Sequence, residues 1–353
     1  MAVDYIIIGQ GICGTWIGYY LLKENKSFIV IDKGNLQSAS HAAGGLINPV
    51  TGRRVVTTWM AEALLPFVWK EYIAFGSALN LHCIDQKNSL AFPSATDLQQ
   101  AFMERIKQQN SFIQQPSVSR ETLRHAFNFP FDVFEINPCY VIKMQALLHA
   151  FRAHLTEKNI LREEVFDENE LQEGEGFIDY KGIKATKIIY ADGICSSQSR
   201  YWKNLPFVQN KGQALVIQAE GLNASYTYKL GHLTLVSLKD NVWWAGSSNE
   251  LDFTTAAPTE AFKARTTALL QSILKKDFTV TGHWSALRPA TVERRPFIGF
   301  HPQYKNVGIL NGMGSKGCSL APWFARQLVQ NMLYDAPLDA LADVSRFAKA
   351  LSR

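Results

Sequence analysis

The stretch VDYIIIGQGICGTWIGYYLLKENKSFIVIDKG, residues 3–34, has the pattern of a βαβ unit. Residues 5–8 form a short apolar run rich in β-branched side chains, as is typical of a buried parallel strand. Residues 15–23 are predicted to form a helix that is apolar on most faces, and residues 28–31 a second buried strand. This order predicts an α/β fold that begins almost at the first residue.

Three glycines follow the first strand in the spacing G-x-G-x-x-G, and an acid ends the second strand. Gly9 permits a tight turn, Gly11 lets a pyrophosphate approach the backbone, and Gly14 lets the helix pack closely on the strand. Asp32 stands where a carboxylate accepts hydrogen bonds from ribose hydroxyls, which also argues against NADP. The pattern predicts a dinucleotide site; the alternative is an ordinary crossover with a glycine-rich turn.

Length and composition narrow the class of protein. The 353 residues suggest about two domains, and 47% hydrophobic content is ordinary for a globular chain. The apolar runs are too short to span a bilayer, and residues 1–8 lack the basic start of a signal peptide. A net charge of +5 permits an anionic partner without requiring one. The five cysteines form no CxxC pair, so we expect no metal site, no disulfide framework and a cytoplasmic location.

Further elements are predicted along the rest of the chain. Helices are expected over 57–75, 96–109, 120–127, 143–158, 256–276 and 319–333. Strands are expected over 133–136, 176–180, 183–190, 214–219, 226–230, 232–238, 242–246 and 307–310, whereas 283–295 is expected to be irregular and basic. Parallel βα patterns at both ends and near 140–200 indicate one nucleotide-binding domain that pieces of a second domain interrupt.

Five segments together are similar to a known family. They are GQGICG with Asp32, SASHAAGGLINP (38–49), KGQAL (211–215), WSALRPATVERRPFIGFHP (284–302) and NGMGSKGCSLAPWFARQL (311–328). These segments resemble the D-amino-acid-oxidase-like family of FAD-dependent amine oxidoreductases, which includes glycine oxidase. The first motif is shared with many FAD and NAD enzymes, but the last two are more specific. The resemblance is weakest from about residue 59 to 138.

The resemblance implies FAD as cofactor and a particular domain plan. A Rossmann-like FAD-binding domain of the GR2 type would comprise residues 1–56, 139–205 and 286–353. An α+β substrate domain with a mixed or antiparallel sheet would comprise residues 57–138 and 206–285. The implied cofactor-binding residues are Gly9, Gly11, Ile12, Gly14, Asp32, Lys33, Ser40, His41, Ala42, Gly45, Leu46, Val165, Ala191, Gly193, Gly312, Gly314, Ser315, Lys316 and Gly317, and no metal ligand is implied.

Several of these residues have two interpretations. The loop around Ser40 suits a chain that runs against a flat ring, or is a flexible Gly/Ala loop. By resemblance His41 either carries a covalent FAD, as in dimethylglycine and sarcosine dehydrogenases, or has a hydrogen-bonding or packing role. Val165 is expected in a strand, with its backbone on adenine. Ala191 and Gly193 match a turn that passes the cofactor, and the residue between them, Asp192, has no assigned task.

Arg288 and Lys316 are the two candidate catalytic residues. By resemblance Arg288, in an expected loop before Pro289, binds the substrate carboxylate with its planar guanidinium; the alternative is a surface ion pair. The glycine-rich turn 312–317 is placed by the resemblance at the flavin N1–C2=O edge, where N–H dipoles stabilise developing negative charge. Lys316 either adds a positive charge there or is a solvated loop lysine.

These features predict an enzyme that oxidises a C–N bond of an amino acid or a secondary amine. Hydride would pass to flavin N5, and O2 or a quinone-type acceptor would reoxidise the flavin. One alternative is a flavin oxidoreductase that matures methylaminomethyl-uridine in tRNA; the chain shows no basic stripe with interleaved aromatics, which disfavours a tRNA or DNA partner. A second alternative is a non-catalytic flavin-binding protein.

Overall fold

The structure is a computed structural model that describes residues 1–352. Its first sheet contains strands from both ends and the middle of the chain, in the order β11-β2-β1-β14-β13-β12, with β21 on β14 and β20 on β21. The strands are β1 (Ala2–Ile8), β2 (Phe28–Ile31), β11 (Leu161–Arg162), β12 (Leu171–Gly174), β13 (Phe177–Tyr180), β14 (Ile183–Tyr190), β20 (Phe297–Phe300) and β21 (Val307–Asn311). Five of them, β11, β2, β1, β14 and β21, run parallel.

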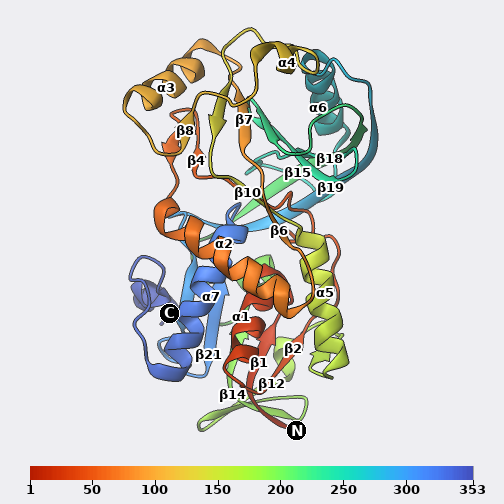
Figure 1. The fold of residues 1–353 in the computed structure, drawn as a ribbon. Coiled ribbons are helices and arrows are strands. Elements are labelled where there is room, and N and C mark those ends of the chain that lie inside the picture. Colours follow the sequence, from red (N-terminus) through yellow and green to blue (C-terminus); the bar gives the residue numbers. More distant parts are fainter. Residues whose placement is uncertain (353) are drawn as a thin grey trace.

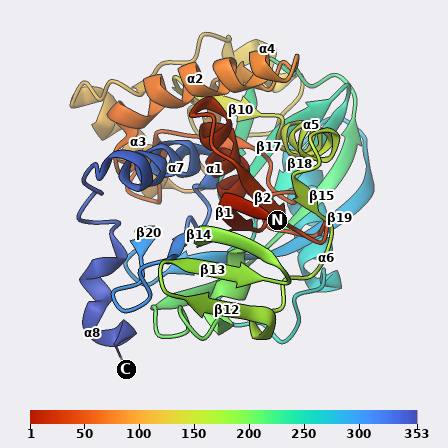
Figure 2. The ribbon, with the colours of Figure 1, turned by 90° about the horizontal axis from the view of Figure 1, so that it is seen from below.

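Helices cover one face of this sheet, and its own β12–β13 hairpin folds over the other face (Figure 2). Ile7 and Val30 pack into a core with α1 (Ile12–Lys23), α2 (Ala61–Ala78), α5 (Met144–Glu157) and α7 (Gly317–Tyr334). Ile6 and Ile29 point the opposite way, because successive strand residues alternate between faces, and pack with Tyr180 of β13. Figure 2 shows these helices on one side of β1 and the β12–β13 hairpin on the other. The sheet is therefore buried on both faces, as its continuous apolar strands predict.

A second sheet is largely antiparallel. Its order is β19-β15-β18-β17-β16-β7-β9-β8, and the β16–β7 pair alone is parallel. The strands are β7 (Ser89–Phe92), β8 (Ile113–Gln114), β9 (Phe134–Ile136), β15 (Phe207–Ala219), β16 (Thr227–Leu230), β17 (Leu233–Lys239), β18 (Val242–Gly246) and β19 (Phe278–Thr291). In Figure 1 this sheet lies above the first, among α3 (Thr96–Lys107), α4 (Arg120–Arg124) and α6 (Glu260–Ile273).

Two smaller sheets and a short last helix are also present. A three-stranded sheet contains β3 (Leu46–Ile47), β10 (Tyr140–Ile142) and β6 (Ile84–Gln86), and a two-stranded one contains β4 (Val50–Thr51) and β5 (Val56–Thr57). The last helix is α8 (Ala348–Leu351). No helix within residues 1–352 has both the length and the apolar character needed to cross a bilayer.

The predicted fold class is confirmed, and most predicted elements exist with ends that differ by up to four residues. The expectation that 283–295 is irregular is wrong, because residues up to Thr291 belong to β19, which pairs with β15 along its length. Pro289 is tolerated because β19 is the edge strand, where a missing N–H costs no ladder bond. Val165 is not in a strand: it follows β11 in a loop and is 65% exposed, whereas the next residue, Phe166, packs on the core with Tyr180.

Candidate FAD and substrate site

The carboxyl ends of the parallel strands bring the predicted cofactor residues to one edge of the first sheet. Gly9 follows β1, Asp32 follows β2, Ala191 follows β14 and Gly312 follows β21. Val165 comes three residues after β11. In an open α/β sheet this edge is where ligands bind, because the loops and helix N-termini converge there. The turns from opposite ends of the chain thus meet at one place.

One large cavity lies at this edge. Its volume is about 1490 Å³. This exceeds the roughly 300–1,000 Å³ of an ordinary small-molecule pocket, so there is room for a dinucleotide and a small substrate together. The predicted residues that line it are Gly9, Gly11, Ile12, Asp32, Lys33, Ser40, His41, Ala42, Gly45, Leu46, Val165, Ala191, Gly193, Arg288, Gly314, Ser315, Lys316 and Gly317.

Gly14 and Gly312 are predicted site residues that do not line the cavity. Both allow the close packing of residues next to the cavity wall. A Cβ on Gly14 would lie 1.9 Å from the carbonyl oxygen of Gly9, so only glycine lets α1 start so close to the turn. The turn itself depends on Gly9, whose φ is +90° and whose Cβ would lie 2.8 Å from Ala191 O. Gly312 has a φ of +78°, and its Cβ would lie 2.7 Å from Thr291 Cγ2.

The first turn and the loop after β2 are joined by hydrogen bonds. Ser40 Oγ accepts a hydrogen bond from the N–H of Ile12 at 3.0 Å, which ties the loop around Ser40 to the start of α1. Asp32 Oδ2 accepts from Gln10 N–H at 2.8 Å, and Oδ1 accepts from Gly34 N–H and from Arg152 Nη1. Because a carboxylate oxygen accepts two hydrogen bonds, Oδ2 keeps a position for a ribose hydroxyl.

These features fit a bound FAD. The N-cap residue of α1, Gly11, has no side chain to cap the helix. Ile12 N–H donates to Ser40, and the next N–H groups of the first turn are available to a pyrophosphate. Gly9 and Gly11 leave the backbone uncovered at the same point, and Asp32 lies at the cavity wall beyond them. Sequence reasoning missed Arg152, which holds Asp32 in place from α5 and carries no local motif.

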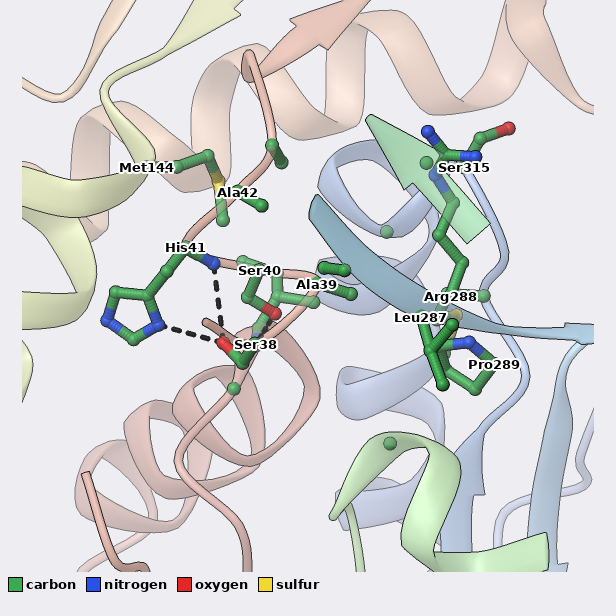
Figure 3. A pocket seen from close by; sticks show the side chains of 18 of the residues that line it. Ser38, Ala39, Ser40, His41, Ala42, Met144, Leu287, Arg288, Pro289 and Ser315 are labelled. Atoms are coloured by element: carbon green, nitrogen blue, oxygen red, sulfur yellow. Dashed lines mark hydrogen bonds between the residues drawn. The ribbon is translucent and has the colours of Figure 1, made fainter. Parts of the chain in front are cut away.

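His41 lies on the far side of its loop from Arg288 in Figure 3. Its Nδ1 is hydrogen-bonded to Ser38 Oγ at 2.8 Å, and burial lowers the pKa of its imidazole. The side chain therefore has a hydrogen-bonding partner within its own loop. Trp244 of β18 holds the other end of the loop by donating from Nε1 to Ala42 O at 3.0 Å.

Arg288 lies inside β19, not in the loop that we expected, and its side chain reaches Gly212 of β15. A Cβ on Gly212 would lie 1.9 Å from Nη2 of Arg288, so the guanidinium covers this glycine. Nη1 donates to Asn210 Oδ1 at 2.6 Å and to Ser248 O at 3.1 Å, and Nη2 donates to Ser247 Oγ at 2.7 Å. Within residues 1–352 no carboxylate pairs with Arg288, so the surface ion pair is wrong.

The glycine-rich turn 312–317 is attached directly to β19, the strand that carries Arg288. The N–H of Gly314 donates to Pro289 O at 2.9 Å, and α7 begins at Gly317. Lys316 lines the cavity beside this helix N-terminus, and burial lowers the pKa of its ammonium group. It is half-buried, not a fully solvated loop lysine.

Asp192 enters the cavity wall between Ala191 and Gly193, where the sequence assigned it no task. Its carboxylate accepts a hydrogen bond from Ser196 Oγ. Burial raises the pKa of Asp192 to about 7. The group therefore carries less than a full negative charge at neutral pH, which reduces its repulsion of a nearby phosphate.

Comparisons with known proteins give the family of this chain. A sequence model described as FAD dependent oxidoreductase matches residues 4–331. Glycine oxidase of Bacillus subtilis (strain 168) is 24% identical over 349 residues, with 90% of each chain covered. Glycine oxidase from Geobacillus kaustophilus has a similar fold, with a TM-score of 0.79, 18% identity and 98% of each chain covered. Iminodiacetate oxidase from Chelativorans sp. BNC1 has a TM-score of 0.76 and 18% identity, covering 96% of this chain and 98% of that one. The chain belongs to the family of FAD-dependent oxidoreductases.

Proposed function

We propose that this enzyme oxidises a C–N bond of an amino acid or a secondary amine, with hydride transfer from the carbon next to nitrogen to FAD. The observation that carries the proposal is Arg288, a cation that has no acidic partner among residues 1–352 and faces the cavity beside the glycine-rich turn 312–317. Two of the similar proteins named above are glycine oxidases and one is an iminodiacetate oxidase.

Arg288 is suited to bind a substrate carboxylate. Its three protein partners are neutral oxygens, so they orient the guanidinium without cancelling its charge. Burial lowers the pKa of the guanidinium, and a bound carboxylate would offset that desolvation. A carboxylate held there fixes the position of the attached carbon and amine, and such orientation is the main contribution that this chemistry asks of a protein.

Lys316 is proposed to act at the other side of the substrate. It lines the cavity at the N-terminus of α7, where helix N–H dipoles and its ammonium group have the same sign. This environment stabilises negative charge that develops in the cavity during the reaction. The acceptor that later removes the electrons, O2 or a quinone, is part of the proposal.

Anaerobic flavin reduction tests the proposal. The FAD-loaded protein is mixed with glycine, sarcosine, D-amino acids, proline and methylaminomethyl-uridine, and bleaching of the flavin absorbance is recorded. Rapid bleaching by amines that carry a carboxylate is expected. Bleaching by the uridine alone would assign the enzyme to tRNA maturation, and a flavin inert to every amine would contradict an enzymatic role in amine oxidation.

A further inference from the structure

A second cation lines the cavity on the face of the second sheet. Lys229 of β16 pairs with Thr234 of β17, which pairs with Gly246 of β18, which pairs with Ala214 of β15. All four residues line the cavity that contains Arg288. They form one row across the sheet, and residues in such a row share a face.

Among the described residues, Lys229 has no partner that would neutralise its charge. Within residues 1–352 its ammonium group makes neither an ion pair nor a hydrogen bond. The side chain is half-buried, and burial lowers the pKa of its amine. An anion that binds beside a partly desolvated and unpaired cation is stabilised by it, so the free energy of the protein with its ligand falls.

The wall that the second sheet contributes contains no carboxylate among the described residues. Its charged lining residues are Arg288 and Lys229, and His232 and His283 also line it. The acids of the cavity come from the edge of the first sheet, where the nucleotide is proposed to bind; they are Asp32, Glu164 and Asp192. The substrate end of the cavity therefore favours anions at two separate positions.

The distance between the two cations limits what binds them. The guanidinium of Arg288 covers Gly212 of β15, and β15 and β16 are three strand spacings apart. At about 4.8 Å per spacing this is roughly 14 Å across the strands, and Gly212 lies two residues along β15 from Ala214, the residue in the row of Lys229. With about 3.4 Å per residue the separation is roughly 16 Å, which the flexible stem of Lys229 shortens. Two carboxylates on neighbouring atoms are too close together to reach both.

We propose that Lys229, with the Thr234 hydroxyl beside it, binds a second anionic group of the substrate. The substrate class is then an amino acid or secondary amine whose second carboxylate, or other anion, is separated from the first by a spacer of several bonds. This inference rests on the proposed function for its amine, but the anion site is a property of the cavity and is tested by binding alone.

Titration calorimetry on the FAD-loaded protein gives the test. Unreactive dicarboxylates from glutarate to suberate are compared with monocarboxylates of equal length. We expect the longer dicarboxylates to bind more tightly than their monocarboxylate partners. Lys229→Met should weaken dicarboxylate binding about tenfold, equivalent to about 1.4 kcal/mol, and leave monocarboxylates unchanged. Lys229→Arg should restore binding, and Lys239→Met, at an exposed lysine of the same sheet, should have no effect.

Equal affinity for dicarboxylates and monocarboxylates at every length would overturn the inference, and this comparison needs only the unmodified protein. An equal loss for both classes in Lys229→Met would also overturn it. If the binding results hold but no amine reduces the flavin, the proposed function fails and the anion site stands. If amines reduce the flavin but a second carboxylate adds no affinity, the anion site fails and the proposed function stands.

Discussion

The edge of the first sheet and the face of the second sheet border the same cavity but are built differently. At the edge, each turn follows its own strand, and Gly9 and Asp32 belong to one continuous segment. On the face, Arg288 depends on Asn210, Ser247 and Ser248, which come from distant parts of the chain. Local sequence motifs determine the edge of the first sheet, whereas strand register determines the face of the second sheet. We therefore expect substitutions on the two sides of the cavity to have different effects.

The largest predicted effect is on the sheet face. Gly212→Ala places a methyl group where the Arg288 guanidinium lies, because the Cβ would be 1.9 Å from Nη2. We expect kcat/KM for a carboxylate-bearing amine to fall about 100-fold while FAD content stays unchanged, since the displaced cation loses a charge-assisted contact. Steady-state kinetics and the flavin absorbance per chain measure both. Gly282→Ala in β19, whose Cβ would lie 3.3 Å from Val216, is the control, and a similar loss there would contradict the assignment.

The next effect is on the sheet edge and should show the reverse pattern. Gly9→Ala introduces a Cβ that lies 2.8 Å from Ala191 O at a φ of +90°. We expect FAD content to fall about tenfold, since backbone on both sides of the turn must shift. Gly182→Ala has a similar φ of +80° but nothing within 4 Å, so it isolates the backbone strain. Normal FAD content in Gly9→Ala would show that the turn does not bind the cofactor.

A smaller effect concerns the pH dependence of stability at the same edge. The pKa of Asp192 is raised by burial to about 7, so between about pH 4 and 7 the folded state holds a proton that the unfolded state has lost. The stability contribution of this group therefore falls as pH rises through that window. Asp192→Asn should be more stable than the unmodified protein at pH 8, by roughly 2 kcal/mol, and similar at pH 4. Urea unfolding of the apoprotein at both pH values measures this, and an equal difference at both would refute it.

The weakest effect is at His41. Its Nδ1 is already hydrogen-bonded to Ser38 within the loop, which supports a non-covalent role. Acid precipitation of the holoprotein should release all flavin into the supernatant, and His41→Ala should retain FAD within about twofold, as expected for one lost hydrogen bond. Flavin that stays with the precipitated protein, and is released from His41→Ala, would establish the covalent bond instead.

The sequence predicted the edge of the first sheet well because its signals are local. The strand, glycine turn, helix and Asp32 lie within one segment, and each residue type has a direct structural reason there. It predicted the face poorly. The residues of β19 are mostly half-buried and include Pro289, so they show no alternation, and only their pairing with β15 makes them a strand. The partners of Arg288 carry no motif, although Gly212 inside a strand is a sign of close approach.

Whether Arg288 binds the substrate beside the flavin is decided by measuring FAD content and anaerobic flavin reduction on the same sample of Arg288→Met. We expect full FAD content and a rate of reduction by carboxylate-bearing amines that is at least about 100-fold lower, because a charge-assisted carboxylate contact is lost. Reduction at the unmodified rate with full FAD content would show that the substrate does not depend on Arg288.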